Sequence, residues 1–397
     1  MQVEGVQILL KTEARPAAGA ADDAELSAEA VTLPRAQWSV SVIIPAFNAQ
    51  ATLAACLEAL LAQTRPADEI IVVDDGSTDR TAEVARRFPV TVIRLASNSG
   101  PGVARNEGAK VARGRLFAFT DSDCVAPPDW LQRMCAALSD PGVVAVTGGY
   151  SGSAAPGFLP ALQHELLRRR QAALPSEIAS TITSNLVCRA DAFARVGGFP
   201  VYYCGRGSSR AVWGNEDEEL GMLLALKGGR IRWLQDVGVA HHFRADLRGF
   251  LRQQRFYAEA ILMSHLRFAA LWRLQSNYSR GGGALHVLLA AAVGAGGVLS
   301  GFSMLLGPSA AAELARVILL TLTGLSALAW LSLPIPAVRH LARRGETPLS
   351  LCRAFGVLLL IDFAWLAGLA RGLLRSLRGF HVADGYDAAS DLARTAR

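Results

Sequence analysis

The sequence predicts an α/β domain with a mainly parallel sheet and flanking helices, followed by C-terminal transmembrane helices. Between residues 38 and 270, short and wholly apolar strand-like runs alternate with helical stretches. Such alternation is typical of a parallel sheet that is covered by helices on both faces. Beyond the three glycines at 281–283 the chain becomes strongly apolar, over lengths of the ~20 residues that span a bilayer.

The predicted strands are the apolar runs at residues 40–44, 70–73, 90–95, 116–120 and 143–147. Leu53, Leu57, Leu60 and Leu61 share one face of a predicted helix after the first strand. Further helices are predicted near residues 81–87, 103–111 and 130–138. Residues 148–268 are less regular, with helices at 218–226 and from Leu247 onward and a strand at 230–234. We expect the acceptor side of a site in this second half.

The composition divides the chain into four predicted segments. Residues 1–37 are rich in Ala, Asp and Glu without a sustained apolar period, which predicts a disordered tail. They also lack the apolar stretch of a signal peptide. The other predicted segments are an enzyme domain at 38–270, a membrane region at 284–378 and a C-terminal tail at 379–397.

Charge and cysteine usage narrow the class of protein. The net charge is +6 and the pI is near 9.2, but no basic stripe is interleaved with aromatic residues, so no nucleic-acid partner is expected. Arginines that flank membrane helices account for the charge. The six cysteines form no CxxC pair and no zinc spacing, which fits a reduced cytosolic domain, although their even number leaves disulfides open.

The apolar region predicts a multi-pass protein of the cell membrane. Residues 284–306 and 317–338 are each long enough to cross a bilayer, and the basic residues Arg339, Arg343 and Arg344 favour a cytoplasmic position after them. The enzyme domain is therefore expected in the cytoplasm. Residues 354–374 contain Asp362, and two readings stay open: a third span, or an amphipathic helix in the membrane interface.

Acidic residues follow two of the predicted strands directly. The strand ends read Pro45-Ala46-Phe47, Asp74-Asp75-Gly76-Ser77-Thr78-Asp79 and Asp121-Ser122-Asp123. The carboxyl ends of parallel strands meet at one edge of a sheet, where ligands bind. Clustered carboxylates need a cation or hydrogen-bond donors to offset their repulsion, and a divalent metal with a nucleotide supplies both.

The triplet 121–123 is the centre of the functional hypothesis. A hard divalent cation binds carboxylate and phosphate oxygens, and it stabilises the charge that develops on a departing diphosphate. One carboxylate would bind the metal and the other the ribose or metal-bound water. The alternative is a solvated acidic turn that caps the next helix; the position after an apolar strand favours the metal.

Several other residues are candidates for which more than one interpretation stays open. One carboxylate of Asp74 and Asp75 is expected to cap a helix and the other to accept a hydrogen bond from a base edge. Phe47 either stacks on the base or packs in the core. Arg105 follows a glycine-rich turn at 98–102 and pairs with phosphate, pairs with Asp121, or lies on the surface.

The acidic run 216–219 opens a predicted helix. A first turn that complements the helix dipole explains some of these charges, but four exceed that need. An inverting sugar transfer requires one carboxylate to take the proton of the acceptor hydroxyl, for which Asp217 is the first candidate and Glu216 the second. His241 follows a strand-like segment and is either structural or completes the metal shell that Asp123 begins.

These elements together resemble the family 2 glycosyltransferases of GT-A fold, a Rossmann-like arrangement. The similar segments are residues 41–48, 71–79, 102–108, 119–123, 197–199 and 216–217. The stretch 252–256, Arg-Gln-Gln-Arg-Phe, does not fit the Q-x-x-R-W element of processive members.

The resemblance implies an inverting enzyme that uses a UDP- or GDP-linked sugar. It implies that Asp75 lies at the base, Asp121 near the ribose or Arg105 and Asp123 on Mg²⁺ or Mn²⁺, and that Asp217 is the catalytic base. The further candidates for donor binding are Pro45, Ala46, Phe47, Arg105 and Ser122, and His241 is the further candidate for the metal. The expected acceptor is lipid-linked or an envelope glycan at the membrane. Alternative hypotheses are a polyprenyl-phosphate glycosyl synthase and a non-catalytic scaffold that binds nucleotide-sugar.

Overall fold

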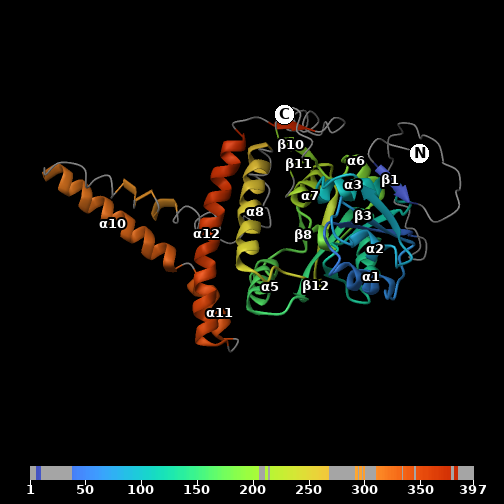
Figure 1. The fold of residues 1–397 in the computed structure, drawn as a ribbon, viewed down its shortest axis with the longest axis horizontal. Coiled ribbons are helices and arrows are strands. Elements are labelled where there is room, and N and C mark those ends of the chain that lie inside the picture. The colour runs from blue at the N-terminus through green and yellow to red at the C-terminus, as the bar shows by residue number, and fades with distance from the viewer. Residues whose placement is uncertain are drawn as a thin grey trace. The chain divides into compact units, whose positions relative to one another are not determined.

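The computed structural model describes residues 6–9, 38–204, 211–212, 215–267, 291–293, 295–296, 298–299, 310–332, 334–343, 346–376 and 380–382 (Figure 1). The chain divides into two compact units. The first comprises residues 1–155, 171–242 and 380–397, and the second comprises residues 156–170 and 243–379. The chemistry predicted from the sequence lies in the first unit, which is described first.

The first unit alternates strands and helices. Its strands are β1 (Val6–Leu9), β2 (Val40–Ala46), β3 (Glu69–Asp74), β4 (Thr91–Leu95), β5 (Leu116–Phe119), β6 (Cys124–Val125), β7 (Val143–Ser153), β8 (Glu177–Ile178), β9 (Leu186–Arg189), β10 (Tyr202–Cys204), β11 (Ala211–Val212), β12 (Arg230–His241) and β13 (Phe380–Val382). Its helices are α1 (Leu53–Leu61), α2 (Thr81–Ala85), α3 (Pro101–Val111), α4 (Trp130–Ala136), α6 (Ala190–Arg195) and α7 (Glu216–Leu226), with 3-10 turns η2 (Ala137–Ser139) and η3 (Thr183–Asn185).

The main sheet is mostly parallel, as predicted. Its order is β1-β4-β3-β2-β5-β9-β7-β12-β6, with β8 paired to β12, while β11, β10 and β13 form a small second sheet. Strands β4, β3, β2 and β5 are parallel neighbours, and β7 is parallel to β12. The chain order reverses between β2 and β5, which is the point where such sheets bind ligands.

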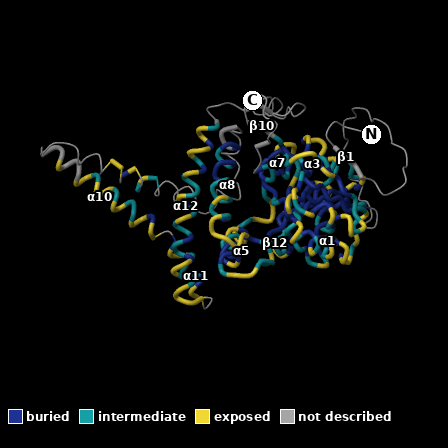
Figure 2. Tube along the Cα trace, in the orientation of Figure 1, coloured by how far each residue is buried: buried dark blue, intermediate teal, exposed yellow. Residues whose placement is uncertain are grey.

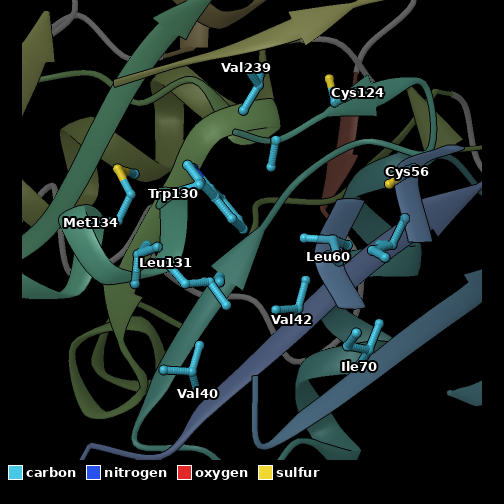
Figure 3. Close-up of a cluster of buried hydrophobic side chains, with 14 of the residues drawn as sticks. Val40, Val42, Cys56, Leu60, Ile70, Cys124, Trp130, Leu131, Met134 and Val239 are labelled. Carbon is cyan, nitrogen blue, oxygen red and sulfur yellow. The ribbon is translucent and has the colours of Figure 1, made fainter. Parts of the chain in front are cut away.

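Alternating side chains of the strands build a core on each face of the sheet. From β2, Val40 and Val42 pack on one face with α1 and α4, whereas Ile43 packs on the other face with α3, α6 and α7. Figure 1 shows α3, α6 and α7 on one side of the sheet and α1 and α2 on the other. Figure 3 shows the first core around Trp130. Burial on both faces explains why the strands are apolar throughout (Figure 2).

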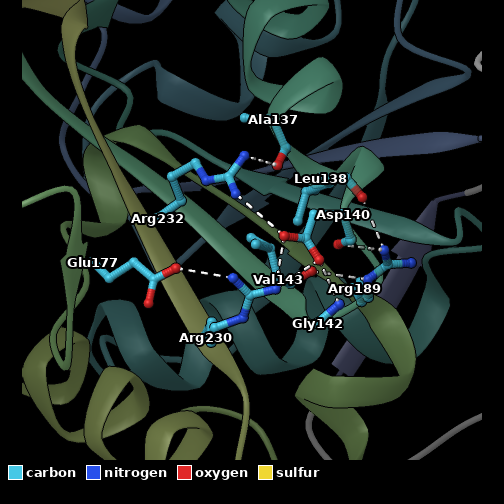
Figure 4. Close-up of polar contacts among 9 residues, drawn as sticks. All are labelled: Ala137, Leu138, Asp140, Gly142, Val143, Glu177, Arg189, Arg230 and Arg232. Atoms are coloured by element: carbon cyan, nitrogen blue, oxygen red, sulfur yellow. Dashed lines mark hydrogen bonds and ion pairs between the residues drawn. The ribbon is translucent and has the colours of Figure 1, made fainter. Parts of the chain in front are cut away.

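An ion-pair network links the strands at the edge of the sheet that lies opposite to the predicted site (Figure 4). Arg230 at the start of β12 donates to both carboxylate oxygens of Asp140, each at 2.7 Å, and to Glu177 at 3.0 Å. Arg189 donates to the carbonyl oxygen of Val143, at 3.1 Å. The Arg230 guanidinium holds the pKa of Asp140 below its usual range. The network joins β12, β8, β9 and the turn before β7.

One strand lies within the segment that the composition assigns to a disordered tail. Residues 6–9, Val-Gln-Ile-Leu, pair antiparallel with β4 in the register Val6 to Leu95. The physical reason is that β4 would otherwise end the sheet with unpaired backbone groups, and a β-branched apolar run can pair with them. These four residues therefore form an edge strand within the segment that is predicted to be a tail. The rest of 1–37 lies outside the described residues.

The second unit is helical. It contains α5 (Phe158–Gln171, of which residues 158–170 lie in this unit), α8 (Leu247–Arg267), α10 (Ala310–Ser332), α11 (Ile335–Arg343) and α12 (Pro348–Ser376). Leu159 and Leu162 of α5 pack with Phe250 of α8, Leu341 of α11 and Ala354 of α12. Helices α8 and α12 lie side by side along their length (Figure 1).

Close packing and charge join α8 to α12. A Cβ at Gly368 would lie 2.1 Å from the carbonyl oxygen of Arg255, so only glycine allows this approach. The Arg371 Nε lies 3.3 Å from a carboxylate oxygen of Glu259, and Arg375 also pairs with that carboxylate. One face of α12 is thus covered by α8, while Leu360, Phe363 and Leu374 of α12 are exposed.

Two helical segments are long and apolar enough to cross a membrane, namely residues 317–343 and 348–375. By length and composition alone this is weak evidence. The first contains the predicted span 317–338, and the second contains 354–374. The predicted span at 284–306 lies largely outside the described residues. Within the second segment, Asp362 accepts a hydrogen bond from Trp330 Nε1 at 2.6 Å.

Candidate active site

The loops after β2 and β3 are locked together at the carboxyl edge of the sheet. The Asn48 N–H donates to Ser77 Oγ at 2.9 Å, and the Thr78 N–H donates to Asn48 Oδ1 at 2.9 Å. Asn48 has a φ of 50° and Gly76 a φ of 69°, a region that Asn and Gly tolerate best. These bonds fix the loop that follows Phe47.

Of the two adjacent aspartates, Asp74 takes the local structural role and Asp75 holds a neighbouring loop. Asp74 Oδ1 accepts a hydrogen bond from the Ser77 N–H at 2.9 Å. The carboxylate of Asp75 accepts from the N–H groups of Ser99 at 2.7 Å and Gly100 at 2.8 Å. Burial raises the pKa of Asp75 to about 6, although those donors act to lower it. Asp75 therefore joins the β3 end to the start of α3.

Arg105 is buried and bridges two acidic segments. Its Nη2 donates to Asp121 Oδ1 at 2.7 Å and its Nη1 to Glu216 Oε1 at 3.0 Å. Its side chain is 3% exposed, and its guanidinium lies 5.4 Å from the ring centroid of Phe199. Of the readings open from sequence, the structure shows the pair with Asp121. It adds Glu216, which lies 111 positions further along the chain. The bridge brings the end of β5 and the start of α7 together.

Asp217 lies next to this bridge in the first turn of α7. The Glu218 N–H donates to Asp217 Oδ1 at 2.9 Å, and Thr181 Oγ1 donates to the Asp217 carbonyl oxygen at 2.6 Å. Burial is the largest cause that raises the pKa of Asp217 to about 7, and the charge of Glu216 raises it further. A carboxyl group with such a pKa can both accept and release a proton near neutral pH.

Asp123 and His241 face each other across the pair of strands β6 and β12. Asp123 Oδ1 lies 3.4 Å from His241 Nε2, and the His242 N–H donates to the Asp123 carbonyl oxygen at 2.9 Å. Cys124 pairs with His241 in the strand register. One oxygen and one imidazole nitrogen at this separation fit two ligands of one divalent cation. Asp123 and His241 therefore fit the metal site that the sequence predicts.

Tyr150 and Ser184 are residues near this pair that the sequence analysis did not name. The rings of Tyr150 and His241 have centroids 5.3 Å apart, and Ser184 Oγ donates to the Tyr150 hydroxyl oxygen at 3.0 Å. Thr120 Oγ1 donates to the Ser184 carbonyl oxygen at 2.9 Å. No sequence spacing signals these contacts, because they depend on β7 and η3 meeting the end of β5.

The remaining candidates at the strand ends differ in exposure. Pro45 and Ala46 are buried inside β2, and the carbonyl oxygen of Ala46 accepts the Asp75 N–H at 2.8 Å. Phe47 is 46% exposed, so it does not pack in the core. Ser122 is half-buried. Only Phe47 of these presents a large side chain to solvent.

The sheet and its flanking helices have the GT-A fold. A solved mannosyltransferase, PcManGT from Pyrobaculum calidifontis, has the same fold, with a TM-score of 0.51 and 19% identity over 85% of this chain and 87% of that one. Residues 41–197 match the model of Glycosyl transferase family 2. The matched segment, which holds the strand ends with Asp75, Asp121 and Asp123, is a domain of this family.

Curated relatives agree with the family. Glycosyltransferase AglE of Haloferax volcanii is 33% identical over 171 residues, which are 41% of this chain and 56% of that protein. The pre-mycofactocin glycosyltransferase of Mycobacterium tuberculosis is 30% identical over 229 residues, 55% of this chain and 46% of that protein. The chain thus spans about half the length of these curated relatives.

Proposed function

We propose that the protein transfers a sugar, with inversion, from a UDP- or GDP-linked donor to a lipid-linked or envelope-glycan acceptor at the membrane. The observation that carries this proposal is the Arg105 bridge. It joins the Asp121 end of β5 to the first turn of α7, which supports one site that contains a candidate donor residue and the candidate base. Residues 38–270 would form the enzyme domain.

The donor is assigned to the carboxyl edge of β2, β3 and β5. In this assignment the backbone around Pro45 and Ala46 lies beneath the bound nucleotide, and the exposed ring of Phe47 stacks on the base. Asp75 holds the neighbouring loop at Ser99 in place. Asp121 and Ser122 face the ribose, with Asp121 oriented by Arg105. PcManGT was solved with GDP-Man and Mn²⁺. We propose a donor and a cofactor of the same chemical classes, with Mg²⁺ or Mn²⁺ as the ion.

Asp123 and His241 would hold that ion. When bound, it neutralises charge on the departing diphosphate. The His242 N–H and the β6–β12 pairing fix the backbone on both sides of the two ligands. This preorganisation is what a metal site requires of its protein.

Asp217 is proposed as the base in preference to Glu216. Glu216 is paired with Arg105 at 3.0 Å, so its carboxylate already has a partner. Asp217 has a pKa near 7, suited to take the proton of the acceptor hydroxyl as that oxygen attacks the anomeric carbon. As the bond to the sugar forms, the bond to the diphosphate oxygen breaks and the diphosphate leaves.

The acceptor class follows from the helices of the second unit. Helices α10 and α12 carry exposed apolar side chains, among them Val317, Leu325 and Leu360. We propose that they place the enzyme at the cell membrane as a multi-pass protein with its catalytic domain in the cytoplasm.

Transfer assays test the proposal. Purified full chain with Mn²⁺, labelled UDP- or GDP-sugars and membrane lipid extract should yield a labelled lipid or glycan, and Asp123→Ala should lower that yield by about 100-fold or more. Equal product from the Asp123→Ala protein would remove the metal role. Donor binding without product on any acceptor would instead indicate a non-catalytic scaffold.

A further inference from the structure

Tyr150 lies against His241, the proposed metal ligand on the neighbouring strand. Strands β7 and β12 are parallel, and Tyr150 is paired with Val239, two positions before His241. The ring centroids of Tyr150 and His241 lie 5.3 Å apart, and the ring planes meet at 56°. This separation is within the range of aromatic rings in contact. The proposed reaction assigns no role to this tyrosine.

The hydroxyl end of Tyr150 is held by a second set of contacts. Ser184 Oγ donates to the Tyr150 hydroxyl oxygen at 3.0 Å, and Thr120 Oγ1 donates to the Ser184 carbonyl oxygen at 2.9 Å. Ser184 and Thr120 are both buried, and Thr120 directly precedes Asp121 in the chain. The tyrosine ring is therefore fixed at both ends, by its strand and by the segment that leads into the acidic triplet.

Asn185 fixes the backbone of β7 and β12 beside the two rings. Its Nδ2 donates to the carbonyl oxygen of Gly149 at 3.0 Å and to that of Val237 at 2.8 Å. The pairing of the two strands is irregular between Leu234 and Val239, and Asn185 bonds to both strands at this irregularity. Bulges of this kind re-aim side chains next to a site. The backbone that carries the two rings is thus held in one arrangement.

We propose that Tyr150 is a positioning residue that holds the imidazole of His241 toward Asp123 and thereby sets the affinity of the site for its divalent ion. The inference rests on the proposed function, in which Asp123 and His241 hold Mg²⁺ or Mn²⁺. A histidine ring turns easily about the bond to its Cβ, because this torsion has broad minima. The packed tyrosine ring restricts that rotation, so that His241 Nε2 stays 3.4 Å from Asp123 Oδ1. Groups that orient a metal ligand typically contribute ~10–100-fold to metal affinity.

Mn²⁺ binding, followed by electron paramagnetic resonance of the free ion, tests this role in the full chain in detergent. Tyr150→Leu removes the ring and should weaken binding by about 10-fold to 100-fold. Tyr150→Phe keeps the ring and loses only the Ser184 bond, so its affinity should stay within about fivefold of the wild type. The control is Tyr257→Leu on α8, which removes another hydrogen-bonded tyrosine and should bind Mn²⁺ like the wild type.

A second background shows whether Tyr150 acts through His241. His241→Ala should itself weaken Mn²⁺ binding, and adding Tyr150→Leu should then change the affinity by less than about twofold, because the imidazole that the ring holds is absent. A further loss of about tenfold in the double variant would reveal a general disturbance of the fold and overturn the inference.

The same titrations separate this inference from the proposed function. Wild-type affinity in Tyr150→Leu, together with weakened binding in Asp123→Asn, would overturn the role of Tyr150 and leave the proposed metal site intact. Absence of Mn²⁺ binding in the wild type would overturn the metal site and this inference with it. If Tyr150→Leu does not fold, Tyr150→Met fills the space with a flexible chain and should still lower the affinity at least about tenfold; wild-type affinity there would overturn the role of the ring.

Discussion

Arg105 is the residue on which the geometry of the site depends most. It is 3% exposed and contacts two carboxylates whose own side chains are 28% and 10% exposed, Asp121 and Glu216. A buried cation that neutralises two anions cannot be removed without leaving uncompensated charge. The bridge also sets the spacing between Asp121 and the first turn of α7, which carries Asp217.

Replacing Arg105 with methionine should therefore destabilise the protein strongly. We expect a loss of about 3–5 kcal/mol in urea unfolding, because Asp121 and Glu216 lose their common partner. The control is Arg195→Met, which breaks an exposed pair with Asp191 on α6 and should cost less than about 1 kcal/mol. Equal losses of unfolding free energy in the two variants would show that the bridge contributes no more to stability than an exposed ion pair.

The raised pKa of Asp217 predicts the pH dependence of catalysis. A general base must be ionised, so kcat/KM should rise about tenfold per pH unit on the acid side and level off above a pH of about 7. A rate profile between pH 5 and 9 measures this. A flat profile over that range would exclude Asp217 as the titrating base.

The same pKa predicts that Asp217 destabilises the fold at neutral and higher pH. Its folded pKa of about 7 exceeds the unfolded value of ~3.9, so the folded state binds the proton more tightly. The protonated carboxyl group therefore makes its full contribution to folding stability below about pH 4. That contribution is lost as the pH rises to about 7 and the buried group ionises. Asp217→Asn should therefore raise stability at pH 8 by roughly 1–3 kcal/mol. The exposed control Asp191→Asn should not; a destabilised Asp217→Asn protein would contradict this sign.

The sequence indicates the residue types of the site but not their partners. Asp75, Asp121 and Asp123 follow apolar strands, and strand ends converge, so their proximity could be predicted. The pair of Arg105 with Glu216 spans 111 positions and depends on how α7 packs against α3. The contacts of Tyr150 with Ser184 and His241 likewise depend on tertiary packing and leave no local pattern.

At the scale of elements, the long apolar strands and the amphipathic helices were predictable and the short pieces were not. Mainly apolar runs determine β2, β3 and β5, because these strands are buried on both faces. Strand β6 has two residues and η3 has three, too few to show a period. The pairing of β1 with β4 could not be read from a segment rich in Ala, Asp and Glu.

Close helix packing should make Gly368 intolerant of larger residues. A Cβ there would lie 2.1 Å from the Arg255 carbonyl oxygen and 2.8 Å from the Ala258 Cβ, so Gly368→Val must push α12 away from α8. We expect a loss of at least about 1–3 kcal/mol, measured as a lower Tm in detergent. Gly356→Val on the same helix is the matched control, since a Cβ there meets nothing within 4 Å. Equal Tm values for both variants would contradict the observed α8–α12 contact.

At the scale of the whole molecule, the second unit exposes an apolar surface on its helices. The mean hydropathy is +0.27, and exposed apolar side chains of the second unit gather on α10 and α12, including Leu322, Leu328 and Leu374. Exposed apolar area on this scale marks contact with a membrane or a partner. Composition alone predicted this region, whereas the cover that α8 provides to one face of α12 required the structure.

The proposed membrane attachment of the full chain can be tested by fractionation. After expression, the protein should remain in the membrane fraction when carbonate at high pH strips peripheral proteins, because the apolar faces of α10 and α12 are stabilised by lipid. Immunoblotting of pellet and supernatant measures this, with a known peripheral protein as control. Release of most of the chain into the supernatant would contradict a membrane-spanning anchor.

We propose that Asp217 and the Asp123 site act on one bound donor. Calorimetry and turnover with the same nucleotide-sugar and Mn²⁺ test this proposal on Asp217→Asn. We expect donor affinity within about threefold of the wild type, with turnover lower by about 100-fold to 10,000-fold, because general-base catalysis contributes ~10²–10⁴. Turnover close to that of the wild type would exclude Asp217 as the base.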